Sequence, residues 1–324
     1  MRRPVRLLGG MLLGLMLLTS STMSAAAQQQ MTIAYSIPGA NFPFFKVMWD
    51  GAHAAAAQIG GVQIQDLDGQ DDDAKQLAGC ESAVAQHVDG VVISPRTVDG
   101  LAGCFSAAAA ANIPVMTVDR RAADGTKGIL GHVGADNVAG GQAAGKFIAD
   151  RLGGQGRVIE LLGTPGASPA IDRSKGFHDA LAAYPDIQIV ASQTANFKTD
   201  DALRVTETIL TGLGSTPDNP GFDAMFSAND DMAMGALQAL QAQGLDSSKF
   251  VIVGFDALSI ALDAIEAGTL TATIDQYPNE QAAKAVQALV DFKRTGAKPA
   301  TDTLFLMPKV ITIDNSKSAS TPRT

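Results

Sequence analysis

Short apolar runs alternate along most of the chain with longer stretches in which apolar residues recur at helical spacing. The short runs predict β-strands and the longer stretches predict amphipathic helices. A regular strand–helix alternation is typical of parallel βαβ units, in which helices cover both faces of a sheet. The units form two successive series, so we predict an α/β protein with two doubly wound parallel-sheet lobes.

The predicted strands cover residues 32–37, 62–67, 90–94, 115–118, 128–133, 156–162, 187–192, 224–227, 250–254, 270–275 and 303–313. The predicted helices cover residues 44–59, 74–86, 100–111, 139–152, 174–183, 200–211, 231–243, 259–267 and 280–295.

No Pro- or Ser-rich linker separates the two series, so short crossovers should join the lobes as a three-segment hinge. We place these crossovers near residues 134–136, 275–277 and 307–308. The polar C-terminal tail is expected to be disordered. The predicted parts are an N-terminal lobe of 31–135 plus 277–306, a C-terminal lobe of 136–276 plus 307–314, and a disordered tail of 315–324.

The first 27 residues have the features of a secretory signal peptide. Arg2 and Arg3 give a basic start, residues 7–18 are apolar, and residues 25–27 are three alanines. The apolar run is shorter than the roughly 20 residues that span a bilayer. We predict cleavage after Ala27 and a periplasmic location, with an uncleaved membrane anchor as the alternative.

Charge and motifs exclude several classes of function. The net charge of −9 argues against nucleic acid as a partner, since nucleic acid needs a basic surface. The chain has no GxGxxG motif opening a helix after the first strand, no GxxxxGK[ST] and no GxSxG. Its histidines are scattered, and the acidic run 66–73 lacks the Gly and Glu positions of a calcium loop. We predict no metal, no cofactor and no enzymatic activity.

Polar residues follow four of the predicted strands at their carboxyl ends, where open parallel sheets bind ligands. Carboxylates, guanidinium groups and amides at such an edge suit the binding of hydroxyl groups. The alternatives are a salt bridge between Asp119 and Arg120, and a helix cap formed by Asn229. The residues are Asp119, Arg120, Asn229, Asp256 and Gln276.

Aromatic residues add a second feature. Phe42, Phe44 and Phe45 follow the first strand, and Phe197 lies alone in a polar loop. Aromatic rings can stack on the apolar C–H faces of sugars, although packing in the core or single exposure explains such residues equally well. Arg173 lies in a Gly-, Ser- and Pro-rich stretch that predicts a strand-to-helix loop, where solvent exposure is the alternative.

Several motifs in combination resemble those of a known family. They are NFPFF at 41–45, VDR at 118–120, DNVAGG at 136–141, NDDMAMGAL at 229–237, VGFD at 253–256 and ATIDQ at 272–276. The chain resembles periplasmic pentose- and hexose-binding proteins of ABC importers over residues 32–313, most closely the D-ribose-binding type. The ligand domain of LacI-type regulators shares this fold.

The resemblance implies a set of ligand-binding residues. Phe44 and Phe197 would enclose the sugar ring, with Phe45 beside them. Phe42 and Ser94 occupy further positions of the predicted site. The residues implied to hydrogen-bond the hydroxyls and ring oxygen are Asp119, Arg120, Arg173, Asn229, Asp256 and Gln276.

Three positions depart from the ribose type. Pro38 replaces a serine, and Phe42 and Ser94 each replace an asparagine. A site without a partner for a buried hydroxyl disfavours the sugar that carries it. A different pentose, a hexose, a deoxy sugar or a polyol is therefore as compatible as ribose. Alternatively, Asn41 points inward and takes over the missing role.

The predicted function is that of a monomeric solute-binding protein that captures a monosaccharide or polyol between closing lobes. It would deliver this ligand to an ABC permease in the inner membrane, or feed a chemoreceptor or sensor. A transcription regulator is disfavoured by the signal peptide and by the lack of a basic DNA-binding segment. An exported hydrolase is disfavoured because no nucleophile–base–orienter set is evident.

The two cysteines lie in the helices that follow the second and third predicted strands. With right-handed crossovers and a 2-1-3 strand order, these helices lie side by side on one face of the sheet. An exported chain permits disulfides. We predict a disulfide between Cys80 and Cys104, with two buried free thiols as the alternative.

Overall fold

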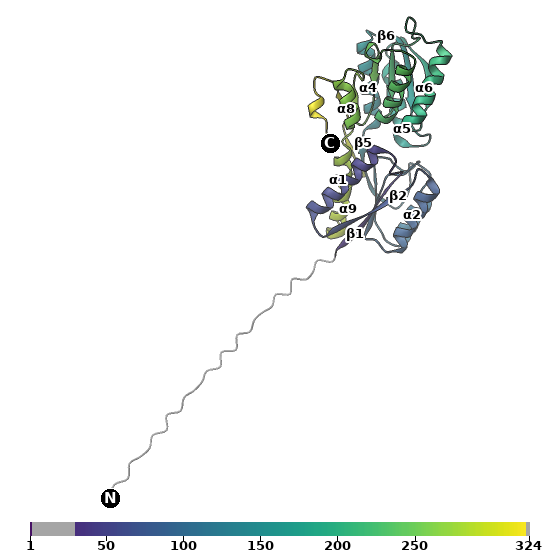
Figure 1. Cartoon of the computed structure of the whole chain (residues 1–324). Helices are drawn as coiled ribbons and strands as arrows, with labels where there is room; N and C mark the ends of the chain where they lie inside the picture. Colours follow the sequence, from purple (N-terminus) through teal and green to yellow (C-terminus); the bar gives the residue numbers. More distant parts are fainter. Residues whose placement is uncertain (2–29, 322–324) are drawn as a thin grey trace.

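The computed structural model describes residue 1 and residues 30–321, which form two α/β lobes stacked one above the other (Figure 1). The N-terminal lobe is built on a six-stranded parallel sheet of order β11-β5-β4-β3-β1-β2. Its strands are β1 (Met31–Ile37), β2 (Val62–Asp68), β3 (Gly90–Ile93), β4 (Val115–Val118), β5 (Ile129–Ala135) and β11 (Thr303–Leu306).

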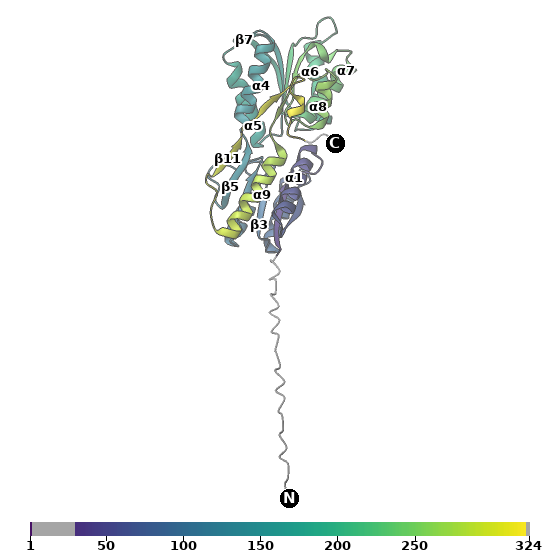
Figure 2. The same ribbon diagram turned by 90° about the vertical axis from the view of Figure 1, so that its left-hand side faces the viewer.

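Helices cover both faces of this sheet. They are α1 (Pro43–Ile59), α2 (Asp73–Ala85), α3 (Ala102–Ala110) and α9 (Pro278–Thr295). Helices α1 and α9 pack against each other on one face, and Figure 2 shows them side by side. Successive side chains of β1 point to opposite faces of the sheet, as in any β-strand. Ile33 and Tyr35 pack toward α1 and α9, whereas Ala34 packs toward α2 and α3.

The C-terminal lobe has a parallel sheet of order β7-β6-β8-β9. β10 lies next to β9 through the Val253–Ala272 bridge, and β12 pairs antiparallel with β10. Its strands are β6 (Gln155–Leu162), β7 (Asp186–Thr194), β8 (Ala224–Ser227), β9 (Val251–Val253), β10 (Thr273–Asp275) and β12 (Lys309–Ile311). Its helices are α4 (Asn137–Arg151), α5 (Ser168–Leu181), α6 (Thr199–Leu213), α7 (Asp230–Ala242) and α8 (Ser259–Glu266), with 3-10 turns η1 (Ser247–Lys249) and η2 (Ser316–Ser318).

The chain passes between the two sheets three times, after β5, after β10 and between β11 and β12. The Asp136 N–H donates to the Leu306 carbonyl over 3.0 Å, so the first and third passages lie side by side. The single strand expected at 303–313 is wrong. Pro308 cannot donate to a ladder and separates two short strands that join different sheets. The doubly wound α/β class itself is confirmed.

The expected disordered tail is wrong for residues 315–321. The N–H and the hydroxyl of Ser320 both donate to the Asp275 carboxylate over 2.6 Å, and Thr321 is buried. These bonds attach the tail to the crossover after β10, which outweighs its polar composition. The predicted signal peptide lies outside the described residues. Within residues 1 and 30–321, no helix combines the length and apolarity that a membrane crossing requires.

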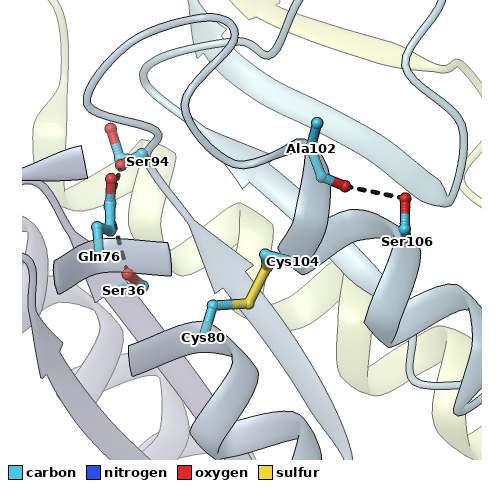
Figure 3. Close-up of a disulfide and its surroundings, with 7 residues drawn as sticks. All are labelled: Ser36, Gln76, Cys80, Ser94, Ala102, Cys104 and Ser106. Carbon is cyan, nitrogen blue, oxygen red and sulfur yellow. Dashed lines mark hydrogen bonds between the residues drawn. A yellow bond between two sulfur atoms is a disulfide. The ribbon is translucent and has the colours of Figure 1, made fainter. Parts of the chain in front are cut away.

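The predicted disulfide is confirmed. Cys80 in α2 and Cys104 in α3 are bonded, with their Cα atoms 5.8 Å apart (Figure 3). Both residues are completely buried where α2 and α3 pack against each other. The same view shows Gln76 of α2, whose side-chain amide donates to the Ser94 carbonyl over 2.8 Å. The disulfide therefore joins α3 to the helix that supports the carboxyl end of β3.

Candidate ligand-binding site

A cavity lies between the lobes and is lined by residues of both. Four of the strands end near it, since several of its polar lining residues come shortly after β4, β8, β9 and β10 in the sequence. The structure brings together ten of the eleven predicted ligand residues and adds two others. The lining residues are Phe42, Phe44, Phe45, Asp119, Arg120, Pro169, Arg173, Phe197, Asn229, Asp231, Asp256 and Gln276.

The N-terminal lobe contributes an aromatic wall. Pro43 occupies the first turn of α1, where its fixed φ is compatible with a helix, and the phenylalanines around it turn toward the cavity. The ring centroids of Phe44 and Phe45 are 5.2 Å apart, and those of Phe42 and Phe45 are 6.1 Å apart, both edge-to-face. All three rings are buried. Asn41 is exposed and does not line the cavity, so it does not replace the missing amide.

The C-terminal lobe contributes the opposite aromatic face. Phe197 is buried rather than exposed, and its φ of 60° is unusual for a bulky residue. Its ring lies against Gly163, where an added Cβ would approach ring atoms to 2.0 Å, so only glycine fits. Rings from both lobes therefore border one cavity, which is the arrangement that encloses both faces of a flat ligand.

Arg120 lies between these aromatic faces. Its guanidinium carbon is 5.2 Å from the Phe45 centroid and 5.4 Å from the Phe197 centroid. The group donates to the Arg96 carbonyl over 2.9 Å and pairs with Asp119 at 3.8 Å. Burial lowers the pKa of Arg120 to about 10, and the Asp119 charge opposes this shift. Because a guanidinium has five N–H donors, this cation retains donors for a ligand.

Arg173 lies in helix α5, so the predicted loop is wrong at this residue. Loop-like composition is compatible with a helix here because Pro169 occupies the first turn, where no N–H bond is lost. The Arg173 Nε donates to Asn137 over 2.8 Å, and its Nη1 donates to the Ala228 carbonyl over 2.6 Å. Burial lowers the pKa of Arg173, and nearby Asp256, 3.5 Å away, opposes the shift.

Two carboxylates pair with the guanidinium groups. Burial raises the pKa of Asp119, opposed mainly by Arg120, and burial raises that of Asp256 well above its usual range, opposed mainly by Arg173. The Gln276 amide donates to Asp256 over 2.5 Å. Asp119 has a φ of 58° and Asp256 a φ of 116°, both in a region that non-glycine residues rarely adopt. Strained backbone of this kind concentrates at functional sites.

Ser94 is the predicted ligand residue that the cavity does not include. It is fully buried one layer behind, and its hydroxyl donates to the Asp119 carboxylate over 3.1 Å. A serine is shorter than the asparagine of the ribose type, so it orients the carboxylate instead of reaching the cavity. Asn229 combines both of its possible roles, since it caps Met232 N at 3.0 Å and also lines the cavity.

Pro169 and Asp231 line the cavity without having been predicted to do so. Pro169 lies in the first turn of α5, in the stretch that the sequence pattern predicts to be a loop. Asp231 follows Asn229 by two residues, where an acidic residue in a first helical turn is ordinary. Among the described residues, no cluster of three or more His, Cys, Asp or Glu side chains could hold a metal ion.

Comparisons with known proteins agree on one family. The family described as periplasmic binding protein domain matches residues 33–297. The ribose import binding protein RbsB of Escherichia coli K12 is 38% identical over 268 residues, which is 83% of this chain and 86% of the relative. The xylitol-binding protein of Mycolicibacterium smegmatis is 35% identical over 240 residues, or 74% and 66% of the two chains.

A solved structure is also close. The Caulobacter myo-inositol binding protein bound to myo-inositol superimposes with a TM-score of 0.84 at 40% sequence identity. The alignment covers 90% of this chain and 96% of that chain. Sequence and structure therefore lead to the same group of proteins.

Proposed function

Because the chain belongs to the periplasmic binding protein domain family, we propose that it is the solute-binding protein of an ABC importer. It captures a monosaccharide, either a pentose or a hexose, or a related polyol between its lobes. The relatives are binding proteins and not enzymes. The observation that carries the proposal is the cavity, in which two arginine–carboxylate pairs lie between aromatic faces from both lobes.

The chemistry of this cavity suits several adjacent hydroxyl groups. Carboxylates accept hydrogen bonds from hydroxyls, and guanidinium groups donate to their oxygens. Such charge-assisted bonds are stronger than neutral ones. The aromatic rings contact the apolar faces of the ligand ring. The names of the relatives include ribose, xylitol and myo-inositol binders, which supports this ligand class without selecting one member.

Contacts between the lobes support a closing mechanism. Lys198 of the C-terminal lobe pairs with Asp71 of the N-terminal lobe, and the Val98 N–H donates to the Gly166 carbonyl over 3.0 Å. Arg121 donates to Asp172 over 2.6 Å. We propose that these contacts form when the lobes close on the ligand and break when they open. The moving bodies are residues 31–135 plus 277–306 and residues 136–276 plus 307–314.

We propose a periplasmic monomer that docks on an inner-membrane permease. Delivery of the same ligand signal to a chemoreceptor or sensor is the second candidate. Transport assays in a strain that lacks the gene separate the two roles.

A thermal-shift screen tests the proposed ligand class. D-ribose, other pentoses, hexoses, myo-inositol and xylitol are each added to purified protein from which bound ligand has been removed. At least one should raise the Tm, because a ligand at 100 times its Kd stabilises the native state by about 2.7 kcal/mol. Calorimetry then gives its Kd. A folded protein that responds to no sugar or polyol contradicts the proposal.

The Phe42→Asn substitution tests specificity at one end of the cavity. The new amide should improve ribose binding relative to wild type by roughly 1–3 kcal/mol if it regains a buried hydrogen bond. Titrations of ribose and related sugars on both proteins measure this difference. Asn41→Ala is the matched control and should leave binding unchanged, since Asn41 is exposed outside the cavity. Tight ribose binding by wild type that Phe42→Asn leaves unchanged or weakens would count against this role of Phe42.

Intact-mass measurement tests the predicted export. The exported protein should begin at Gln28, since residues 25–27 provide the small side chains of a cleavage site. Cells are fractionated and the secreted or periplasmic species is weighed. A species in the membrane fraction that keeps residues 1–27 would show an uncleaved anchor instead.

A further inference from the structure

One carboxylate oxygen of the cavity has no hydrogen-bond partner among the described residues. Asp231, in the first turn of α7, lines the cavity together with Phe42 and Arg173. Asp231 is only 8% exposed, and its Oδ2 atom is buried without a hydrogen-bond partner in the described part of the chain. A buried carboxylate oxygen without a donor costs free energy. An enclosed acceptor of this kind at a cavity wall indicates a donor on the ligand.

The other carboxylates that line the cavity, and Asp230 next to Asp231, have partners. The adjacent Asp230 is fully buried and accepts from the Thr273 hydroxyl over 2.7 Å and from the Leu258 N–H over 2.9 Å. Asp119 pairs with Arg120, and Asp256 pairs with Arg173. The two guanidinium groups of the cavity are thus each matched to one carboxylate, and Asp231 is the third acid. Burial raises the pKa of Asp231 to about 6, which agrees with its lack of a donor.

The position of Asp231 relates it to the departure from the ribose type. Asp231 and Phe42 line the cavity together, and both also line the groove outside it that contains Lys198. Phe42 stands where the ribose type has an amide, which removes a polar group from the N-terminal lobe. Asp231 offers an acceptor to the same region from the C-terminal lobe. An amide both donates and accepts, whereas an ionised carboxylate only accepts.

We propose that Asp231 is a specificity-determining residue that accepts a hydrogen bond from one ligand hydroxyl at the Phe42 end of the cavity. This inference rests on the proposed function. Phe42 makes this end of the cavity apolar from the N-terminal lobe. Asp231, from the C-terminal lobe, still requires a ligand hydroxyl there. A ligand that carries hydrogen, methyl or a methyl ether at that carbon leaves the carboxylate unsatisfied and binds more weakly.

Titration calorimetry on Asp231→Ala and Asp231→Asn tests this proposal. The probes are D-ribose, myo-inositol and their singly deoxygenated analogues. For the parent compound that binds wild type, Asp231→Ala should raise the Kd about 10- to 150-fold, the range for a hydrogen bond to a charged group. For one deoxy analogue, wild type and Asp231→Ala should have the same Kd within about twofold. Asp263→Asn, an exposed carboxylate of α8 in the same lobe, is the matched control and should behave as wild type.

Equal losses for the parent and for every deoxy analogue would overturn the proposal, because they indicate a general structural defect. An unchanged Kd in Asp231→Ala would overturn it as well. A second measurement needs no ligand: ligand-free Asp231→Asn should melt about 2–4 °C higher than wild type, since it removes an unpaired buried charge. A lower Tm would reveal a protein partner for this carboxylate and reject the proposal. Failure of wild type to bind any probe would instead count against the proposed function, and the melting experiment would still decide the state of Asp231.

Discussion

Alanine at Arg120, Arg173 or Asp256 is expected to weaken sugar binding by about 1.5–3 kcal/mol or more, which is roughly a 10- to 150-fold rise in Kd. These three side chains line the cavity and are almost completely buried. Hydrogen bonds that they make to a ligand hydroxyl are charge-assisted and enclosed, so water cannot replace them. Calorimetry with the ligand from the thermal-shift screen measures each loss.

The three variants should differ in stability. Arg173→Ala removes the cation that faces Asp256 and leaves the acceptors on Asn137 and Ala228 without their donor. Breaking a buried ion pair by removing one partner costs about 3–5 kcal/mol. Arg120 has fewer protein partners, so Arg120→Ala should retain more of the wild-type stability. Denaturant unfolding of each ligand-free variant therefore has to accompany the binding measurement.

Arg151→Ala provides the matched control. Arg151 lies on α4 in the same lobe as Arg173, but it is exposed and does not line the cavity. This substitution should leave the Kd unchanged. It should lower the free energy of unfolding by only about 0.5–1 kcal/mol, because the Arg151 guanidinium lies over the Phe147 ring, 5.1 Å from its centroid. Wild-type affinity in Arg120→Ala, Arg173→Ala and Asp256→Ala together would show that the ligand binds elsewhere.

Many of the residues that line the cavity could be predicted because the sheet topology brings them together. Residues that follow parallel strands of one sheet meet at one edge, so Asn229, Asp256 and Gln276 could be grouped from the strand pattern alone, and Asp119 could be placed at the corresponding edge of the other sheet. Arg173 could not be placed in this way. Its segment has the Gly, Ser and Pro content of a loop, and only the family resemblance indicated its role. The helix that holds it is stabilised by packing against α4, which a local pattern does not reveal.

The remaining differences depend on distances across the fold. Ser94 and Asp119 are similar as polar residues at strand ends, and only the depth of burial separates the supporting residue from the lining residue. Asp230 and Asp231 are adjacent identical residues in one helical turn. Thr273 of a distant strand satisfies Asp230 and leaves Asp231 facing the cavity. No neighbouring residue in the sequence encodes that distinction.

Removal of the disulfide is expected to lower the free energy of unfolding by about 3 kcal/mol. Cys80 and Cys104 are 24 residues apart in sequence. Closing a loop of this length lowers the conformational entropy of the unfolded chain, which stabilises the native state by about 3 kcal/mol. The Cys80→Ala/Cys104→Ala double variant avoids placing an unsatisfied hydroxyl in the buried site. Urea unfolding of wild type and variant, each with and without reductant, measures the difference.

Sugar affinity should change much less than stability in this double variant. The link from α2 to the cavity runs through Gln76, which bonds to the Ser94 carbonyl and the Arg96 N–H, both over 2.8 Å, and through Ser94 to Asp119. These bonds do not involve the sulfur atoms, and the packing of α2 on the sheet preserves them. Figure 3 shows the bond from Gln76 to Ser94 beside the disulfide. Reductant should lower the stability of wild type to that of the variant and have no effect on the variant itself. Two titratable thiols in unfolded, unreduced wild type would show that the disulfide does not form in the exported protein. The stability difference between wild type and variant would then vanish, because neither unfolded chain would be cross-linked.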